Sequence, residues 1–243
     1  MGRDVSLALA RQGARVVLAA RTLSMLEEVA EEVRQLGGQA AFQPTDITSE
    51  PDCQRLAQLA VEAFGRSDIL VNNAFVQPPF ETIEQASLET WDRAIDVNLL
   101  GALRMSRAVV PQMKRQGGGS VVFVNSMSIR RTQPYFGVYA ATKFALLSLA
   151  RTMAKELGQS GIRVNSIVPG YIWGSSVEWY FGELAKREGC TPQEVYDRVA
   201  SETCLGHLPT SEEIADVVLF LASDLSRAVT GQALDVNAGH WFE

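Results

Sequence analysis

Two regular patterns of hydrophobic and polar residues alternate along this chain. Short apolar runs predict buried strands at residues 15–20, 40–43, 68–72, 119–125, 162–167 and 232–236. Apolar residues spaced three or four apart predict helices at residues 3–12, 23–36, 50–64, 88–114, 138–158, 176–188, 192–202 and 211–222. Strands that alternate with helices of this length predict an α/β fold, a parallel sheet covered by helices on both faces. Without an internal repeat or linker, residues 1–243 are interpreted as one domain.

Composition narrows the class of protein. The chain is 47% hydrophobic and 21% charged with a net charge of −6, which argues against a general nucleic-acid surface. No run of eighteen apolar residues occurs, so we expect no membrane span. Three cysteines without metal spacing indicate reduced thiols and a cytoplasmic protein. Two histidines leave little for a metal site or a Ser-His-Asp triad, so no metal is expected.

The candidate chemistry lies between Ser126 and Lys143. Tyr139 and Lys143 are four residues apart, which places both side chains on one helix face. An ammonium near a phenol favours the phenolate, so Lys143 is predicted to lower the Tyr139 pKa and make Tyr139 a proton donor or acceptor. Ser126 follows a predicted strand and its hydroxyl could bond the same substrate oxygen. The alternative is a core tyrosine and a solvated lysine that share a face by chance.

Ser126 followed by Tyr139-x-x-x-Lys143 resembles the short-chain dehydrogenases/reductases. The resemblance implies a Rossmann-type doubly wound sheet and an NAD(P)(H)-dependent oxidoreductase that interconverts a carbonyl and a secondary alcohol on a small-molecule substrate. It implies that Tyr139 is the general acid/base, that Ser126 orients the substrate oxygen, and that Lys143 also binds the nicotinamide ribose. Asn98, a poor residue for the middle of a helix, matches the family asparagine that holds a water linked to the lysine.

The resemblance also implies a set of cofactor contacts. Arg21 follows the strand whose family counterpart ends in an aspartate for the NAD ribose, and a guanidinium suits a 2′-phosphate, so NADP(H) is favoured over NAD(H). Alternatively, Arg21 is a solvated residue at a strand end. Asp46 would hold the adenine, or it belongs to a turn in which Thr45 or Asp46 caps the next helix. The other matching positions are Gly2, Ile47, Asn73, Ala74, Pro169, Gly170 and Ile172, together with Tyr139 and Lys143.

Three positions depart from the family pattern. Met1-Gly2 matches only the end of the Gly-rich turn, and the strand before it is missing from the chain as numbered. The native product is interpreted as starting about twenty residues earlier; otherwise the central strand is lacking. Phe75 stands where the family has a glycine that tolerates positive φ and close approach, and Gly174 stands where it has a threonine.

A lid over the substrate is implied at residues 173–206. It carries Trp173, Trp179, Tyr180 and Phe181, which suggest an apolar or ring-containing substrate. The alternative is that these aromatics form the small core of the lid itself. The aromatic tail resembles those of relatives that pack in oligomer interfaces, so a homo-oligomer, a tetramer or a dimer, is expected. The runner-up interpretation is a non-catalytic interaction protein with a dinucleotide fold. An enoyl reductase is disfavoured by the Tyr139-to-Lys143 spacing, and an extended sugar epimerase by the chain length.

Overall fold

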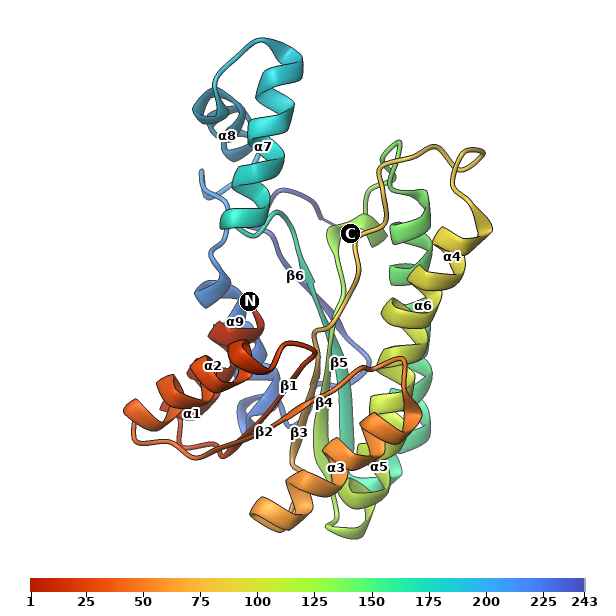
Figure 1. Ribbon diagram of the computed structural model, residues 1–243, viewed down its shortest axis with the longest axis vertical. Coiled ribbons are helices and arrows are strands. Elements are labelled where there is room, and N and C mark those ends of the chain that lie inside the picture. Colours follow the sequence, from red (N-terminus) through yellow and green to blue (C-terminus); the bar gives the residue numbers. More distant parts are fainter. Residues whose placement is uncertain (243) are drawn as a thin grey trace.

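The computed structural model describes residues 1–242 and shows six parallel strands in two sheets (Figure 1). One sheet pairs β1 with β2, and the other has the order β3-β4-β5-β6. The strands are β1 Val16–Ala20, β2 Ala40–Pro44, β3 Ile69–Asn72, β4 Gly119–Val124, β5 Ile162–Pro169 and β6 Ala233–Val236. These positions confirm the predicted α/β class, with strand ends within about two residues of those expected.

Helices cover the sheets on both faces. The bounds are α1 Gly2–Arg11, α2 Leu23–Gln35, α3 Glu50–Phe64, α4 Leu88–Ile95, α5 Ala102–Arg115, α6 Gly137–Leu157, α7 Ser175–Glu188, α8 Pro192–Ser201 and α9 Ser211–Ala222. Side chains of α3, α5 and α6 form one buried cluster with alternate residues of β4 and β5. On the opposite face, α1 and α9 form a second cluster with the intervening residues of the same two strands. This alternation arises because successive strand side chains point to opposite faces. Helix α1 also packs against α2 and β1.

The two sheets share a core although no strand joins them in the part of the chain that is described. Val17 of β1 and Leu70 of β3 pack against the same cluster. Among residues 1–242, β1 pairs only with β2 and β3 only with β4. The predicted lack of a central strand therefore holds for the described structure.

The long helix predicted at residues 88–114 is not regular. The predicted helix is present, but a π-helical turn, Asp96–Gly101, lies between α4 and α5. Gly101 lies so close to the loop before α3 that a Cβ on it would meet Ile47 Cδ1 at 2.5 Å. A π-turn inside an α-helix is often found at a functional site, because it turns a side chain and a carbonyl out of the regular ladder.

Helices α7 and α8 stand apart from the sheets, beyond the carboxyl ends of the strands (Figure 1). They have a small core of their own, built on Phe181, Ala185, Val195 and Leu208. The alternative interpretation of the lid aromatics is thus correct for Phe181. It does not hold for Trp179, whose side chain is 64% exposed.

Candidate active site

Three candidate catalytic side chains converge where β4 ends against α6. The Tyr139 phenol lies close enough to Ser126 for the serine hydroxyl to lower its pKa. The Ser126 hydroxyl also accepts a bond from the Ser128 N–H at 3.2 Å, which fixes its position after β4. Lys143 Nζ lies 5.6 Å from the centre of the Tyr139 ring. The structure thus brings together the serine, tyrosine and lysine that the spacing selected.

The electrostatics of this group differ from the expectation. Burial raises the pKa of Tyr139 to about 12, and the bond with Ser126 only partly opposes that rise. Burial also lowers the pKa of Lys143 to about 8. The Lys143 ammonium donates a 2.8 Å bond to the Val124 carbonyl instead of contacting the phenol. The prediction that Lys143 lowers the Tyr139 pKa is therefore not met in this structure. Desolvation dominates the Tyr139 pKa, because the Lys143 ammonium bonds the Val124 carbonyl and does not contact the phenol oxygen.

Asn98 sits in the π-turn and its side chain is fully committed to protein partners. Its Oδ1 accepts the Val76 N–H at 2.7 Å, and its Nδ2 donates to the Val76 carbonyl at 3.0 Å and to Thr142 Oγ1 at 3.2 Å. The amide thereby fastens the loop after β3 to the face of α6 that bears Tyr139 and Lys143. Sequence reasoning missed Val76 and Thr142 as partners; the position of Thr142 beside Lys143 in the motif was the one available signal.

Phe75 lies over the tyrosine and the lysine. Its ring meets the Tyr139 ring edge to face at 6.2 Å, and Lys143 Nζ lies 5.6 Å from its centre. The side chain is 55% exposed, and the backbone of Phe75 is outside the left-handed region. The expected conflict between a bulky residue and positive φ therefore does not arise. Phe75 instead adds an aromatic wall beside the candidate catalytic group.

The predicted adenine end of the cofactor site is formed by Arg21 and Asp46. Arg21 is exposed just after β1, and no residue in 1–242 forms an ion pair with it. Asp46 organises its turn: Oδ1 accepts the Thr48 N–H at 2.9 Å and the Thr48 hydroxyl at 2.8 Å. These bonds hold the pKa of the Asp46 carboxyl below its ordinary value, and the nearby Arg21 charge lowers it further. Asp46 therefore has the structural role in the turn that the alternative interpretation predicts, and its carboxylate still lies near Arg21.

The remaining predicted contacts lie along the carboxyl ends of the strands. A Cβ on Gly2 would meet Asn73 Nδ2 at 2.9 Å, so these two positions adjoin, and Ala74 is exposed next to them. Ile47 packs on Gly101 as described above. Pro169 ends β5, a Cβ on Gly170 would meet Asn237 Cβ at 2.9 Å, and Ile172 packs against the α9 cluster. An exposed guanidinium at one end and small residues with close backbone approach at the other fit a dinucleotide in outline.

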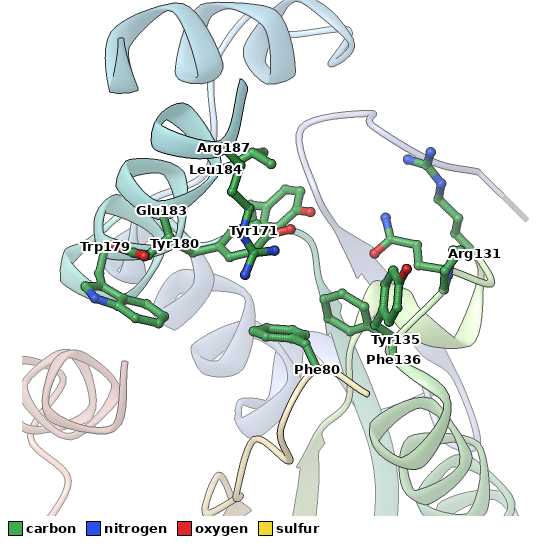
Figure 2. Close-up of a pocket in the computed structure, with 12 residues that line it drawn as sticks. Phe80, Arg131, Tyr135, Phe136, Tyr171, Trp179, Tyr180, Glu183, Leu184 and Arg187 are labelled. Carbon is green, nitrogen blue, oxygen red and sulfur yellow. The ribbon is translucent and has the colours of Figure 1, made fainter. Parts of the chain in front are cut away.

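A cavity of about 390 Å³ opens between α7 and the loop that precedes α6. Figure 2 shows Phe80 and Phe136 facing Trp179 and Tyr180 across it. The Phe80 ring centre is 5.0 Å from that of Phe136 and 5.8 Å from that of Tyr180. Because Phe136 precedes Tyr139 by one helical turn, the aromatic wall continues toward the candidate catalytic group.

Two classes of site have no support in the described residues. Within 1–242, no group of three or more His, Cys, Asp or Glu side chains could hold a metal ion. No helix in the same residues is long and apolar enough to cross a membrane.

Comparison with known proteins gives matches over nearly the whole chain. A family model described as Enoyl-(Acyl carrier protein) reductase matches residues 1–240. An uncharacterized oxidoreductase of Thermotoga maritima is 34% identical over 240 residues, which are 98% of this chain and 92% of that protein.

Two solved structures are similar in sequence and fold. A 7α-hydroxysteroid dehydrogenase complexed with NADH and 7-oxo glycochenodeoxycholic acid is 33% identical, with a TM-score of 0.87 over 98% of this chain and 89% of that one. L-Sorbose reductase from Gluconobacter frateurii, complexed with NADPH and L-sorbose, is 30% identical, with a TM-score of 0.91 over 98% of this chain and 90% of that one.

Proposed function

We propose, from the premise that this chain belongs to the short-chain dehydrogenase/reductase family, that it interconverts an apolar, ring-containing ketone and its secondary alcohol with NADP(H). The relatives establish the coarser activity, an oxidoreductase that acts on hydroxyl and carbonyl groups. The observation that carries the finer proposal is the position of Tyr139 on α6 beside Ser126, which follows β4, one helical turn beyond an aromatic cavity.

The roles of the side chains follow from their protonation states. With a pKa of about 12, Tyr139 is protonated at neutral pH and can donate its proton to a ketone oxygen as that oxygen becomes an alkoxide. Ser126, which lies close to the Tyr139 phenol, would orient the same oxygen. The nicotinamide, when bound, would supply the hydride in reduction or accept it in oxidation. Lys143 would fix α6 to the end of β4 through its bond to Val124. Asn98 would fix the loop after β3 to α6 through its bonds to Val76 and Thr142.

The lining of the cavity supports a ring-containing substrate. Its apolar wall is formed by Phe80, Tyr135, Phe136, Tyr171, Trp179 and Tyr180. Aromatic faces at both sides favour a flat apolar body between them, since offset stacking adds to the gain from buried area. The volume is in the range of small-molecule sites.

Arg21 supports the preference for NADP(H). An exposed guanidinium that forms no ion pair within residues 1–242, although the Asp46 carboxylate lies nearby, can bond a 2′-phosphate with two parallel N–H donors. The solved relatives include one with NADH and one with NADPH, so the family allows either cofactor. Three free cysteines among the described residues support a cytoplasmic location, and exposed Phe144, Phe220 and Leu234 support self-association into a dimer or tetramer.

The test is turnover of a panel of cyclic and aryl ketones with NADPH and with NADH, compared between the wild type and Tyr139→Phe. We expect at least a hundredfold loss of kcat in Tyr139→Phe, because a phenyl ring cannot donate a proton. Tyr196→Phe, which removes a hydroxyl from a tyrosine packed on Trp173 in the lid, should keep full activity. Undiminished turnover in Tyr139→Phe would overturn the mechanism. Absence of turnover with every ketone would favour a non-catalytic protein.

The cofactor preference has its own variant. Arg21→Gln should weaken NADPH binding by about tenfold or more and leave NADH binding unchanged, since the neutral amide loses the charged contact to the 2′-phosphate. Equal effects on both cofactors would contradict the assigned role of Arg21.

A further inference from the structure

The charges around the aromatic cavity are not balanced. Arg131 and Arg187 both line it, and neither has a carboxylate partner within residues 1–242. Glu183 is the acidic residue of the lining, and it pairs with Lys186 outside the cavity at 2.7 Å. The lining therefore has two guanidinium groups and one carboxylate, Glu183, which lies within electrostatic reach of Arg187, although the chain as a whole has a net charge of −6.

The two arginines lie on opposite sides of the cavity. Arg187 belongs to the last turn of α7, and Arg131 belongs to the loop before α6 (Figure 2). The Arg131 guanidinium is held 4.3 Å from the centre of the Trp241 ring. Stacking on an aromatic face fixes the plane of a guanidinium and leaves its N–H groups at the edge free to bond an oxyanion.

The rim of the same cavity contains backbone strain. Tyr135 lies next to the aromatic wall with φ 69°, a conformation that costs a non-glycine residue about 1 kcal/mol or more. Its side chain is nevertheless exposed rather than packed into the core. Strain that is not repaid by core packing is commonly found at sites that contact a ligand.

We propose that the cavity takes ring-containing substrates that bear a carboxylate or another anionic group, with the ring against the aromatic wall and the anion at Arg187 or Arg131. This proposal rests on the proposed function for the reaction and adds the substrate class. The aromatic walls hold the apolar body, and a guanidinium group on either side of the cavity selects acids over their neutral analogues.

Binding can be measured without cofactor or turnover, by isothermal titration calorimetry with two probes of nearly equal shape, 2-naphthoate and 2-naphthamide. The wild type should bind the anion about tenfold more tightly than the amide. Arg187→Gln and Arg131→Gln should each reduce this ratio, and the double variant should abolish it while amide affinity stays unchanged. Arg198→Gln removes the same charge from the lid outside the cavity and should keep the wild-type ratio.

The outcomes separate this proposal from the proposed function. Equal affinity for the two probes in the wild type, no binding of either probe, or a preference for the anion that persists in the double variant would each overturn the substrate class. Selective anion binding by a protein that turns over no ketone would leave the site standing and refute the reaction. Where ketones are turned over, 1-tetralone-6-carboxylate should have a kcat/KM about tenfold above that of its carboxamide, and a preference for the carboxamide would overturn the proposal.

Discussion

Replacing Lys143 with methionine should abolish turnover and stabilise the fold. Lys143 is buried to 2% exposure, and its ammonium has one hydrogen bond, to the Val124 carbonyl. Methionine has nearly the same length and no charge to desolvate. A residue whose burial is costly and which the fold nevertheless retains is typical of a functional site.

The magnitude follows from the pKa of Lys143. The difference between the ordinary value of 10.5 and a folded-state value of about 8 corresponds to about 3 kcal/mol of destabilisation when the lysine is charged in the unfolded chain. Loss of the bond to Val124 offsets about 1–2 kcal/mol of this. We therefore expect the variant to be more stable than the wild type by about 1–2 kcal/mol at pH 7.

The pKa shift of Lys143 also fixes the direction in which stability changes with pH. Between pH 8 and 10.5 the unfolded chain binds a proton at Lys143 that the folded protein does not, so wild-type stability rises with pH through this window. The advantage of the variant should consequently be largest below pH 8 and should disappear near pH 10.

Urea unfolding of the wild type and Lys143→Met at pH 7 and pH 10 measures both quantities. Lys155→Met, at an exposed position of the same helix, is the control and should change stability little at either pH. The reasoning is refuted if Lys143→Met is less stable than the wild type by the same amount at both pH values, because the ammonium would then be stabilised in the fold rather than desolvated.

Three further changes test other contacts. Gly101→Ala should destabilise the fold by about 1–3 kcal/mol in urea unfolding, because its Cβ would meet Ile47 Cδ1 at 2.5 Å, and Ile47→Ala should restore most of the loss; no loss would contradict the packing. Asn98→Ala should cost about 2–3 kcal/mol and at least tenfold in kcat, because both backbone groups of Val76 lose their partner; full activity would show that the loop needs no such anchor. Tyr135→Asn should stabilise the protein by about 1 kcal/mol in the same assay, since asparagine tolerates positive φ; a loss of stability would argue against strain at this position.

Much of the fold could be predicted because local patterns decide it. The period of the apolar residues fixed the strands and helices, and Ser126, Tyr139 and Lys143 meet because parallel strands and their following helices bring carboxyl ends together. Local side chains also begin two of these helices: Thr191 with Glu194 and Thr210 with Glu213 form capping boxes at the starts of α8 and α9.

The predictions that failed concern properties set by burial and by contacts between residues far apart in the sequence. The pKa of Lys143 is set by how completely the surrounding structure buries it, and spacing on a helix carries no information about burial. Asn98 meets Val76 across 22 positions of the chain, and the π-turn that aims it depends on Gly101 packing against Ile47. The position of Phe75 over Tyr139 likewise results from tertiary contacts that no local pattern contains.

The division into two sheets has a consequence for how the protein opens. Amide groups on the side of β1 away from β2 have no strand partner in residues 1–242, whereas β4 and β5 are each paired on both sides. In native-state hydrogen exchange, β1, β2 and α2 should therefore behave as a separate cooperative unit that opens at lower free energy than β4 and β5. Arg21 directly follows β1, so the proposed nucleotide contact belongs to the least protected part of the protein, and a bound nucleotide should slow exchange there first.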